Sequence, residues 1–323
     1  MALPLKPPVE PQLALSRVAL PEGEEWAYEP KWDGFRALAF VDGGEVFLQS
    51  RNGRPLLRYF PELEFPEGRY VMDGEIVVLD GDGREDFDAL GNRMHPAESR
   101  VTMLSKKTPA LYRAFDLLAV DRRKLMAKPL SERRAELEAL VAAAPGRAKA
   151  KSGSVEVTPF TTSADKAQPW LHGGEGVIAK QLGARYLPGE RKGMVKIKRV
   201  RTIDAVVVGW RPGKEEGTVG SLILGLYRGK KLQVVGHTSG FKAAEKRELV
   251  SKLAPYETGE RGSADPSRWS ADRDLEWVGV RPELVIEVSF DHVSGGRIRH
   301  GAKVLRWRED KKPSACTIDQ LNS

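Results

Sequence analysis

Residues 29–36 have the sequence Glu29-Pro30-Lys31-Trp32-Asp33-Gly34-Phe35-Arg36, which combines one lysine with a tight turn and a distal arginine. A lysine amine attacks phosphorus only in its neutral form, which neighbouring cations and burial favour. The glycine lets the backbone run close beside a nucleotide, and the arginine offers a fixed fork of donors for ribose or phosphate oxygens. Taken alone, Asp33-Gly34 is equally compatible with a plain turn between two strands. Only the rest of the chain separates the two interpretations.

Two further polar motifs follow. Ser50-Arg51-Asn52-Gly53 comes after a strand-like run, and Asp73-Gly74-Glu75 lies inside another. Side chains two positions apart share one face of a strand, so Asp73 and Glu75 are expected to point the same way. Because two carboxylates are costly in an apolar core, this face is predicted to border a wet, cation-holding pocket.

The remaining motifs supply an aromatic ring and more basic side chains. Tyr112-Arg113-Ala114-Phe115-Asp116 is placed at the end of a strand and offers Phe115 as a stacking platform for a base. Lys196 and Lys198 are expected on one strand face, after Glu175-Gly176-Val177-Ile178-Ala179-Lys180. Arg306-Trp307-Arg308-Glu309-Asp310-Lys311 lies near the end of the chain. Arg191, in a basic run with Arg185 and Lys192, is expected either to reach a triphosphate or to lie on a solvated face.

The lysine motif resembles the nucleotidyltransferase signature shared by ATP-dependent DNA ligases and mRNA capping enzymes. The ordered set resembles the short bacterial ATP-dependent DNA ligases of the C type, and it is also similar to the ligase domain of bacterial end-joining enzymes. Residues 86–93 resemble the segment that follows the third motif in DNA ligases. Met194 stands where an aromatic residue is common, so packing there is expected to differ. The resemblance implies an α+β fold, with an adenylation (nucleotidyltransferase) domain of ATP-grasp-like antiparallel sheets over residues 1–200 and an OB-fold β-barrel domain over residues 201–323.

The resemblance also implies a role for each matched residue. Lys31 would attack the α-phosphate of ATP, forming a lysyl-AMP phosphoramidate and releasing pyrophosphate. AMP would then pass to the 5′-phosphate of a nick, from which the 3′-hydroxyl would displace it. Glu29 would contact the adenine edge, and Phe115 would stack on the base. The residues expected at the ribose and phosphates are Arg36, Arg51, Glu75, Arg191, Lys196 and Lys198. The carboxylates expected to bind Mg²⁺ or Mn²⁺ are Glu75 and Glu175. The residues expected to orient pyrophosphate, in the first transfer only, are Arg306, Arg308, Asp310 and Lys311.

The expected substrate is nicked double-stranded DNA, with DNA end-binding or repair proteins as further partners and a monomer as the expected state. Trp26 is preceded by too short a stretch for a helical DNA-binding domain, which favours repair over replication. Two alternatives stay open: an RNA ligase or capping-type nucleotidyltransferase, and a catalytically silent DNA-end-binding protein. Arg36 and the final basic motif favour DNA ligation, and covalent labelling by ATP but not GTP would separate the possibilities.

The composition agrees with a nucleic-acid partner. The 52 Lys and Arg against 45 Asp and Glu give a net charge of +7 and a pI near 9.3, which favours a polyanion. The single cysteine, Cys316, excludes a disulfide framework and a multi-cysteine zinc site. No apolar run approaches the roughly 20 residues of a membrane helix, and the N-terminus is too proline-rich for a signal peptide. A cytoplasmic, nucleoid-associated protein is expected.

Short apolar runs bounded by Gly, Asp and Pro predict strands at 35–40, 45–49, 69–79, 110–118 and 176–180, then at 205–210, 221–227, 231–235 and 284–290. One helix is predicted from Ser131, as N-cap, to a stop at Pro145-Gly146, and another over 242–253. The texture changes after residue 199, so a hinge is expected over Arg199–Asp204.

Overall fold

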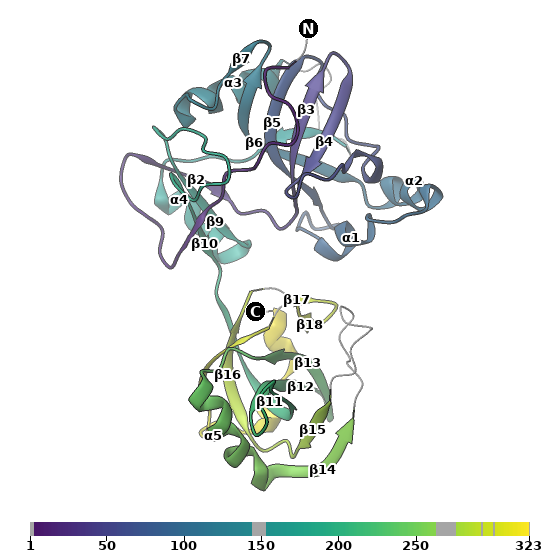
Figure 1. Cartoon of the computed structure of the whole chain (residues 1–323), viewed down its shortest axis with the longest axis vertical. Helices are drawn as coiled ribbons and strands as arrows, with labels where there is room; N and C mark the ends of the chain where they lie inside the picture. The colour runs from purple at the N-terminus through teal and green to yellow at the C-terminus, as the bar shows by residue number, and fades with distance from the viewer. Residues whose placement is uncertain (1–2, 144–152, 263–275, 292, 300, 323) are drawn as a thin grey trace. The chain divides into compact units, whose positions relative to one another are not determined.

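The computed structural model describes residues 3–143, 153–262, 276–291, 293–299 and 301–322. The chain divides into two compact units, Met1–Arg199 and Val200–Ser323 (Figure 1). Each unit has its own apolar core. No described helix is long and apolar enough to cross a membrane.

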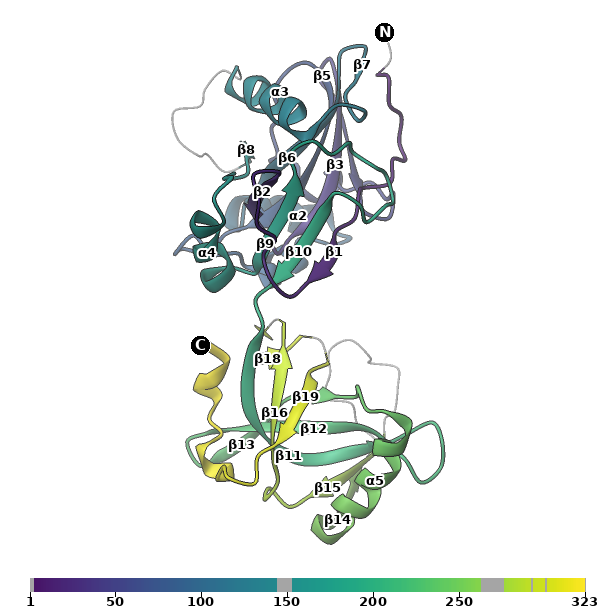
Figure 2. The same ribbon diagram turned by 90° about the vertical axis from the view of Figure 1, so that its left-hand side faces the viewer.

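The first unit is built around a six-stranded sheet. Its order is β4 (Glu45–Ser50), β3 (Phe35–Asp42), β5 (Arg69–Val78), β6 (Ala110–Val120) and β7 (Arg123–Lys124), all antiparallel, with β8 (Val155–Val157) parallel to β6. The central strand β5 is buried along almost its whole length, and its apolar residues on both sides of Asp73-Gly74-Glu75 agree with that burial. Helix α3 (Leu130–Ala142) packs on β6 and β8 (Figure 2).

A smaller sheet completes the first unit. Its order is β1 (Leu15–Arg17), β10 (Met194–Lys198), β9 (Gly176–Gln181) and β2 (Trp26–Pro30). Helix α4 (Ala164–Gly173) packs on β2 and β9 over a small apolar cluster. Two short helices, α1 (Phe87–Asn92) and α2 (Glu98–Lys107), lie between β5 and β6 in the chain, and the Asp86 side chain caps α1 by accepting from the backbone N–H of Ala89 at 2.8 Å.

Gly34 is required for packing between strands. A Cβ atom at Gly34 would lie 2.2 Å from the carbonyl oxygen of Ile76 in β5. The sequence prediction gave this glycine a place beside the nucleotide. The structure gives it a different reason, because the backbone after the lysine must pass directly over a neighbouring strand.

Phe115 lies in the middle of β6 and not at its end, as the sequence suggested. In the pairing of β5 with β6, Asp73 faces Asp116 and Gly74 faces Ala114, so Phe115 is the extra residue of a β-bulge. A bulge turns the extra side chain out of the regular alternation of the strand. This turn brings Phe115 into the wall of the cavity described below.

The second unit is a curled seven-stranded sheet, with strand β16 (Val285–Phe290) pairing both β11 (Arg201–Pro212) and β19 (Lys303–Trp307). The other strands are β12 (Val219–Arg228), β13 (Lys231–Thr238), β14 (Glu257–Gly262) and β15 (Trp277–Val280), and β17 (Val293–Ser294) pairs β18 (Arg297–Ile298) as a separate ribbon. Helix α5 (Ala243–Leu253) adds Leu249 and Leu253 to the core.

Most predicted strands are present, and several boundaries differ. Helix α3 begins at Leu130 with Pro129 as its N-cap, so Ser131 is inside the helix. The predicted stop at Pro145-Gly146 lies outside the described residues. The predicted junction over Arg199–Asp204 is longer than the segment that separates the two strands. Strand β10 ends at Lys198, and Asp204 is already paired within β11. Only Arg199 and Val200 separate β10 from β11.

Candidate active site

One cavity of about 230 Å³ collects most of the predicted site residues. Its walls come from the lysine loop between β2 and β3, from β5, β6, β9 and β10, and from the chain just before β1. It is lined by Leu13, Ala14, Glu29, Pro30, Lys31, Trp32, Arg36, Arg51, Glu75, Phe115, Ile178, Lys180, Arg191, Met194 and Lys196.

The backbone around Lys31 is anchored on both sides. The Lys31 N–H donates to the carbonyl oxygen of Gly176 at 3.0 Å. The next residue, Trp32, donates its indole N–H to Thr158 Oγ1 at 2.7 Å, and the Arg113 guanidinium lies 5.0 Å from the centre of its ring. These contacts fix the loop, so the Lys31 side chain extends from a rigid base into the cavity.

Glu29 is a buried carboxylate held between two cations. It is 2% exposed, with Lys180 Nζ at 2.7 Å and Arg134 Nη1 at 3.3 Å. Burial raises the pKa of Glu29, while Lys180 and Arg134 oppose the rise. Arg134 is itself fixed by Thr158, whose carbonyl oxygen accepts at 2.7 Å. The cavity therefore presents a directed acceptor at this end.

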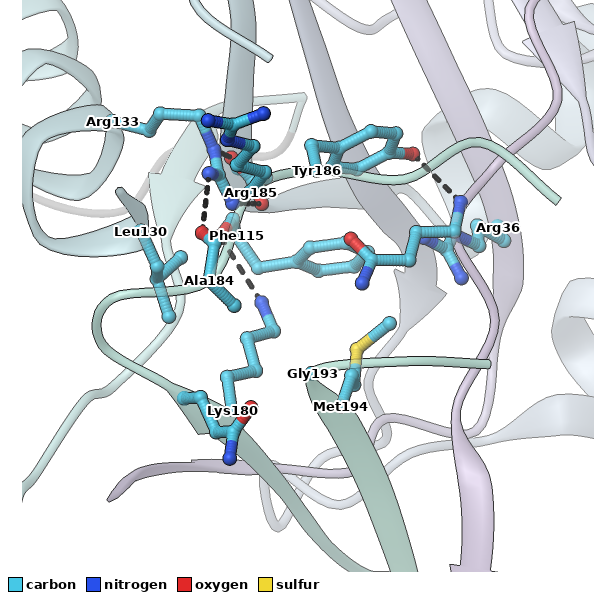
Figure 3. Close-up of a pocket in the computed structure, with 13 residues that line it drawn as sticks. Arg36, Phe115, Leu130, Arg133, Lys180, Ala184, Arg185, Tyr186, Gly193 and Met194 are labelled. Atoms are coloured by element: carbon cyan, nitrogen blue, oxygen red, sulfur yellow. Dashed lines mark hydrogen bonds and ion pairs between the residues drawn. The ribbon is translucent and has the colours of Figure 1, made fainter. Parts of the chain in front are cut away.

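Phe115 lies among cations at the same end of the cavity. Lys180 Nζ lies 4.6 Å, and the Arg36 guanidinium carbon 5.3 Å, from its ring centre. Figure 3 shows Lys180 extended toward Phe115, whose carbonyl oxygen accepts from its Nζ at 3.3 Å. Met194 is buried and lines the same cavity, so a flexible thioether occupies the position where an aromatic residue was noted as common. An aromatic face and a carboxylate acceptor together suit a purine base.

Asp73 does not border a wet pocket, and that part of the sequence prediction is wrong. Its side chain is fully buried and accepts from Arg36 at 2.6 and 3.1 Å and from the Tyr186 hydroxyl at 2.7 Å. The cost of burying this carboxylate is offset by the paired arginine. Glu75 does line the cavity, and burial raises its pKa to about 8, against the opposing charges of Arg36 and Lys31.

Another part of the cavity lining is strongly basic. Arg51, Arg191 and Lys196 line the cavity together with Lys31. Burial, the first cause, and then the positive charges of Lys198, Lys31, Arg51 and Arg191 lower the pKa of Lys196. Arg191 is an exposed residue that also lines the cavity, so it is both solvated and part of the cavity wall. Such a cluster is suited to a polyphosphate.

Lys198 and Glu175 are not among the side chains that line the cavity. Burial raises the pKa of Glu85, and the charges of Glu175 and Asp33 raise it further, so these three carboxylates lie within electrostatic range of one another. Across the described residues, no group of three or more His, Cys, Asp and Glu side chains could hold a metal ion.

The predicted C-terminal group belongs to the second unit. Arg306 Nε lies 2.6 Å from Glu287, Arg308 lies 2.8 Å from both Asp204 and Asp310, and Lys311 Nζ lies 3.3 Å from Asp204. These cations are thus paired with carboxylates of their own unit.

A second, more open cavity of about 350 Å³ adjoins the first. Three side chains, Arg36, Arg51 and Glu75, line both cavities. The second cavity is otherwise lined by Gly34, Phe35, Ser50, Asn52, Leu56 and Met94. Two ligands bound in adjacent cavities would share these three polar groups.

Sequence reasoning assigned no role to several residues of the cavity. Lys180 ends the motif Glu175–Lys180, and the sequence prediction gave it no role. It lies two residues after Ile178, so both side chains are on one face of β9, and both line the cavity. Arg134 stood beside Arg133 in a helix that was predicted only for its apolar residues, and both arginines are buried. Leu13 and Ala14 gave no signal in the expected extended lead-in.

Comparison with known proteins agrees with this geometry. The family model described as "ATP dependent DNA ligase domain" matches residues 11–198, and "ATP dependent DNA ligase C terminal region" matches residues 215–311. The chain is 44% identical to DNA ligase C1 of Mycolicibacterium smegmatis over 345 residues, covering 100% of this chain and 96% of that protein. It is 45% identical to DNA ligase C of Mycobacterium tuberculosis over 350 residues, covering 99% and 96% of the two chains.

A solved structure gives the same result. The ligase domain of M. tuberculosis LigD superposes with a TM-score of 0.53 at 32% identity, covering 96% of this chain and 98% of that one. These matches confirm the expected α+β architecture of a nucleotidyltransferase domain and an OB-fold. They also remove support from the capping-type and silent alternatives. The chain therefore belongs to the family of ATP-dependent DNA ligases.

Proposed function

We propose that the enzyme seals 5′-phosphate/3′-hydroxyl nicks in double-stranded DNA by three phosphoryl transfers, with Lys31 as the nucleophile that carries AMP. The observation that carries this proposal is the composition of the cavity, whose lining combines Lys31 with the acceptor Glu29, the aromatic Phe115 and the basic side chains of Arg51, Arg191 and Lys196. ATP has the complementary layout of a base, a ribose and three phosphates. In-line phosphoryl transfer requires little covalent chemistry from the protein beyond positioning and neutralisation of charge.

Each lining residue has a place in this reaction. Glu29 accepts from the adenine amino group, and Phe115 stacks on the base. Arg36, Arg51 and Glu75 hold the ribose and the nearest phosphate oxygens. Lys196 and Arg191 bind the phosphates. Lys198 does not line the cavity. Burial and then the surrounding positive charges, that of Lys198 first among them, lower the pKa of Lys196, which lines the same cavity as Lys31.

A divalent cation, Mg²⁺ or Mn²⁺, fits the acidic side of this site. Glu75 lines both cavities, and Glu175 lies within electrostatic range of Glu85. Mg²⁺ is commonly held by one or two carboxylates together with several waters and substrate phosphates. When bound, the ion would neutralise charge on the phosphate oxygens. Glu75 and Glu175 are its proposed protein ligands.

The nick enters through the second cavity. Arg36, Arg51 and Glu75 face both cavities, so the groups that bind AMP also contact the DNA end that receives it. After AMP has moved to the 5′-phosphate, the 3′-hydroxyl attacks in the same place. One set of side chains thus serves consecutive transfers.

Repair is the proposed setting of the reaction. The multifunctional non-homologous end joining protein LigD of Pseudomonas aeruginosa is 33% identical over 315 residues, and the match covers 94% of this chain and 36% of that protein. We infer that the enzyme acts as a monomer at the nucleoid, alone or beside DNA end-binding and repair proteins. The net charge of +7 favours binding to DNA.

The decisive experiment is covalent labelling with ATP. Incubation with radiolabelled ATP and Mg²⁺ should attach AMP covalently to the protein through a P–N bond that survives alkali and is cleaved by acid, and labelled GTP should attach little. Lys31→Ala and Lys31→Arg should both abolish the label, since arginine is not deprotonated near neutral pH. Lys128→Ala, which removes an exposed lysine of a surface ion pair, is the matched control and should label normally. Full labelling of Lys31→Ala would remove Lys31 from the mechanism, and an unlabelled wild-type protein would favour a DNA-end-binding role.

A further inference from the structure

The C-terminal basic motif is held by acidic side chains on neighbouring strands of the second unit. Arg306 lies in β19, and Arg308 follows directly after the end of this strand. Strand β19 pairs with β16, which in turn pairs with β11. Glu287 of β16 receives Arg306 at 2.6 Å. Asp204 of β11 receives Arg308 at 2.8 Å and Lys311 at 3.3 Å.

Arg308 has two close carboxylate partners, and Glu287 lies farther away, 3.9 Å from its Nη1. Its Nε and Nη2 donate to the two oxygens of Asp310 at 2.8 Å, and its Nη1 donates to Asp204 Oδ1 at 2.8 Å. The Asp310 side chain is 66% exposed, whereas the Asp204 side chain is 12% exposed. The Arg308 hydrogen bond lowers the pKa of Asp310 to about 2. Asp310 is therefore an outer partner that solvent or an anion can replace, and Asp204 is an inner one.

The backbone of Asp204 is fixed independently of these ion pairs. Its N–H donates to Gln320 Oε1 at 3.0 Å, and its carbonyl oxygen accepts from Gln320 Nε2 at 3.1 Å. Asp204 also faces Glu287 in the register of β11 with β16. The carboxylate thus projects from a strand that is clamped on both sides, which is what a fixed support for a long flexible cation requires.

We propose that Asp204 is a positioning residue for the first transfer, which presets Arg308 and Lys311 in the geometry that receives pyrophosphate. This inference rests on the proposed ligation reaction and on the role that the family resemblance implies for the C-terminal motif, which is to orient pyrophosphate in that step. An arginine held by a rigid inner partner loses less conformational freedom when it meets an anion. One end of Arg308 stays bound to Asp204, while the Nε and Nη2 edge now held by exposed Asp310 becomes available to a phosphate.

A simple charge argument predicts the opposite behaviour. Asp204→Asn removes one negative charge beside Arg308 and Lys311, so it should strengthen binding of any anion if attraction alone mattered. Positioning predicts a loss instead, because the amide no longer holds both cations. The sign of the effect separates the two accounts.

The experiment compares two substrates: ATP with a plain nick, and a nick that already carries 5′-AMP, without ATP. Asp204→Asn should slow self-adenylation about tenfold to a hundredfold, the cost expected for misplaced binding groups. It should leave sealing of the pre-adenylated nick within about twofold of wild type. Discharge of the lysyl-AMP by added pyrophosphate, the reverse of the same step, should slow by the same factor as adenylation. A loss of stability alone would slow sealing of the pre-adenylated nick as well.

Three further variants make the result decisive. Asp204→Glu keeps the charge and displaces the carboxylate, and it should also slow adenylation. Glu283→Gln breaks the ion pair to Arg281 elsewhere in the unit and should change neither reaction. Arg308→Ala should slow adenylation while sparing the pre-adenylated nick.

The outcomes distinguish the inference from the proposal beneath it. If Arg308→Ala is step-specific and Asp204→Asn adenylates at the wild-type rate or faster, the motif keeps its role and Asp204 is not a positioning residue. Equal losses for Asp204→Asn on both substrates would make it a structural residue only. Equal losses for Arg308→Ala would overturn the step assignment of the motif, and the inference about Asp204 with it.

Discussion

Replacing Arg134 by methionine should weaken selection of ATP as well as stability. Arg134 has a side chain that is 8% exposed, and it pairs with Glu29 at 3.3 Å and Glu138 at 2.6 Å. Methionine keeps most of the apolar stem and removes the charge. Glu29 would then retain only Lys180, at 2.7 Å, as a cationic partner. Because burial already raises the pKa of Glu29, losing one opposing charge should raise it further.

The magnitude follows from two contributions. Breaking a buried ion pair lowers the free energy of unfolding by about 3 to 5 kcal/mol. Because Glu29 keeps its contact with Lys180, we expect a loss of about 3 kcal/mol in Arg134→Met. For a unit of this size that corresponds to a Tm lower by about 6 to 12 °C. A hydrogen bond from adenine to a charged acceptor is worth about 1.5 to 3 kcal/mol, so its weakening should raise the KM for ATP by about 10- to 150-fold.

The assay is single-turnover self-adenylation over a range of ATP and GTP concentrations, together with thermal unfolding. A protonated Glu29 can donate to the O6 of guanine, so the preference for ATP over GTP should fall in Arg134→Met. The control is Arg93→Met. Arg93 is a fully buried arginine that pairs with Glu62 at 2.6 Å, and it lines neither cavity. It should lower the Tm and leave the ATP-to-GTP ratio unchanged. An unchanged ratio in Arg134→Met, or the same change in both variants, would refute the reasoning.

The remaining predictions concern pH, stacking and salt. The pKa of Glu75 is about 8 in the folded protein, whereas its ordinary value is 4.5. Between pH 4.5 and about 8, the folded protein therefore keeps a proton on Glu75 that the unfolded chain has lost. Stability should therefore fall as pH rises from about 5 to about 8, and Glu75→Gln should flatten that fall in denaturant titrations; an unchanged slope would contradict the placement. Phe115→Leu should raise the KM for ATP by about 5- to 150-fold while Phe115→Tyr stays near wild type, and equal KM values in kinetic assays would exclude stacking. Affinity for nicked DNA should drop on the order of a hundredfold between about 50 and about 200 mM salt in binding titrations, whereas a flat response would exclude phosphate contacts as its main source.

Several residues that line the cavity could be named from local sequence because they stand at short fixed spacings. Lys31 and Arg36 lie on one loop and the strand after it, and Lys196 lies on a short strand of alternating pattern. Spacings of this kind survive in any fold that keeps the strands, since side-chain direction alternates along them. The apolar runs likewise predicted most strands of both units, although their ends moved by one to a few residues.

The partners of the buried charges depended on contacts between distant parts of the chain. Glu29 and Arg134 are 105 positions apart, and Asp204 and Arg308 are 104 apart. Sequence gave no measure of the burial of Asp73, and a bulge opposite β5 placed Phe115 in the cavity. Whether a carboxylate faces water or a buried arginine depends on which strands become neighbours, because desolvation and pairing act over a few ångströms in space and not along the chain.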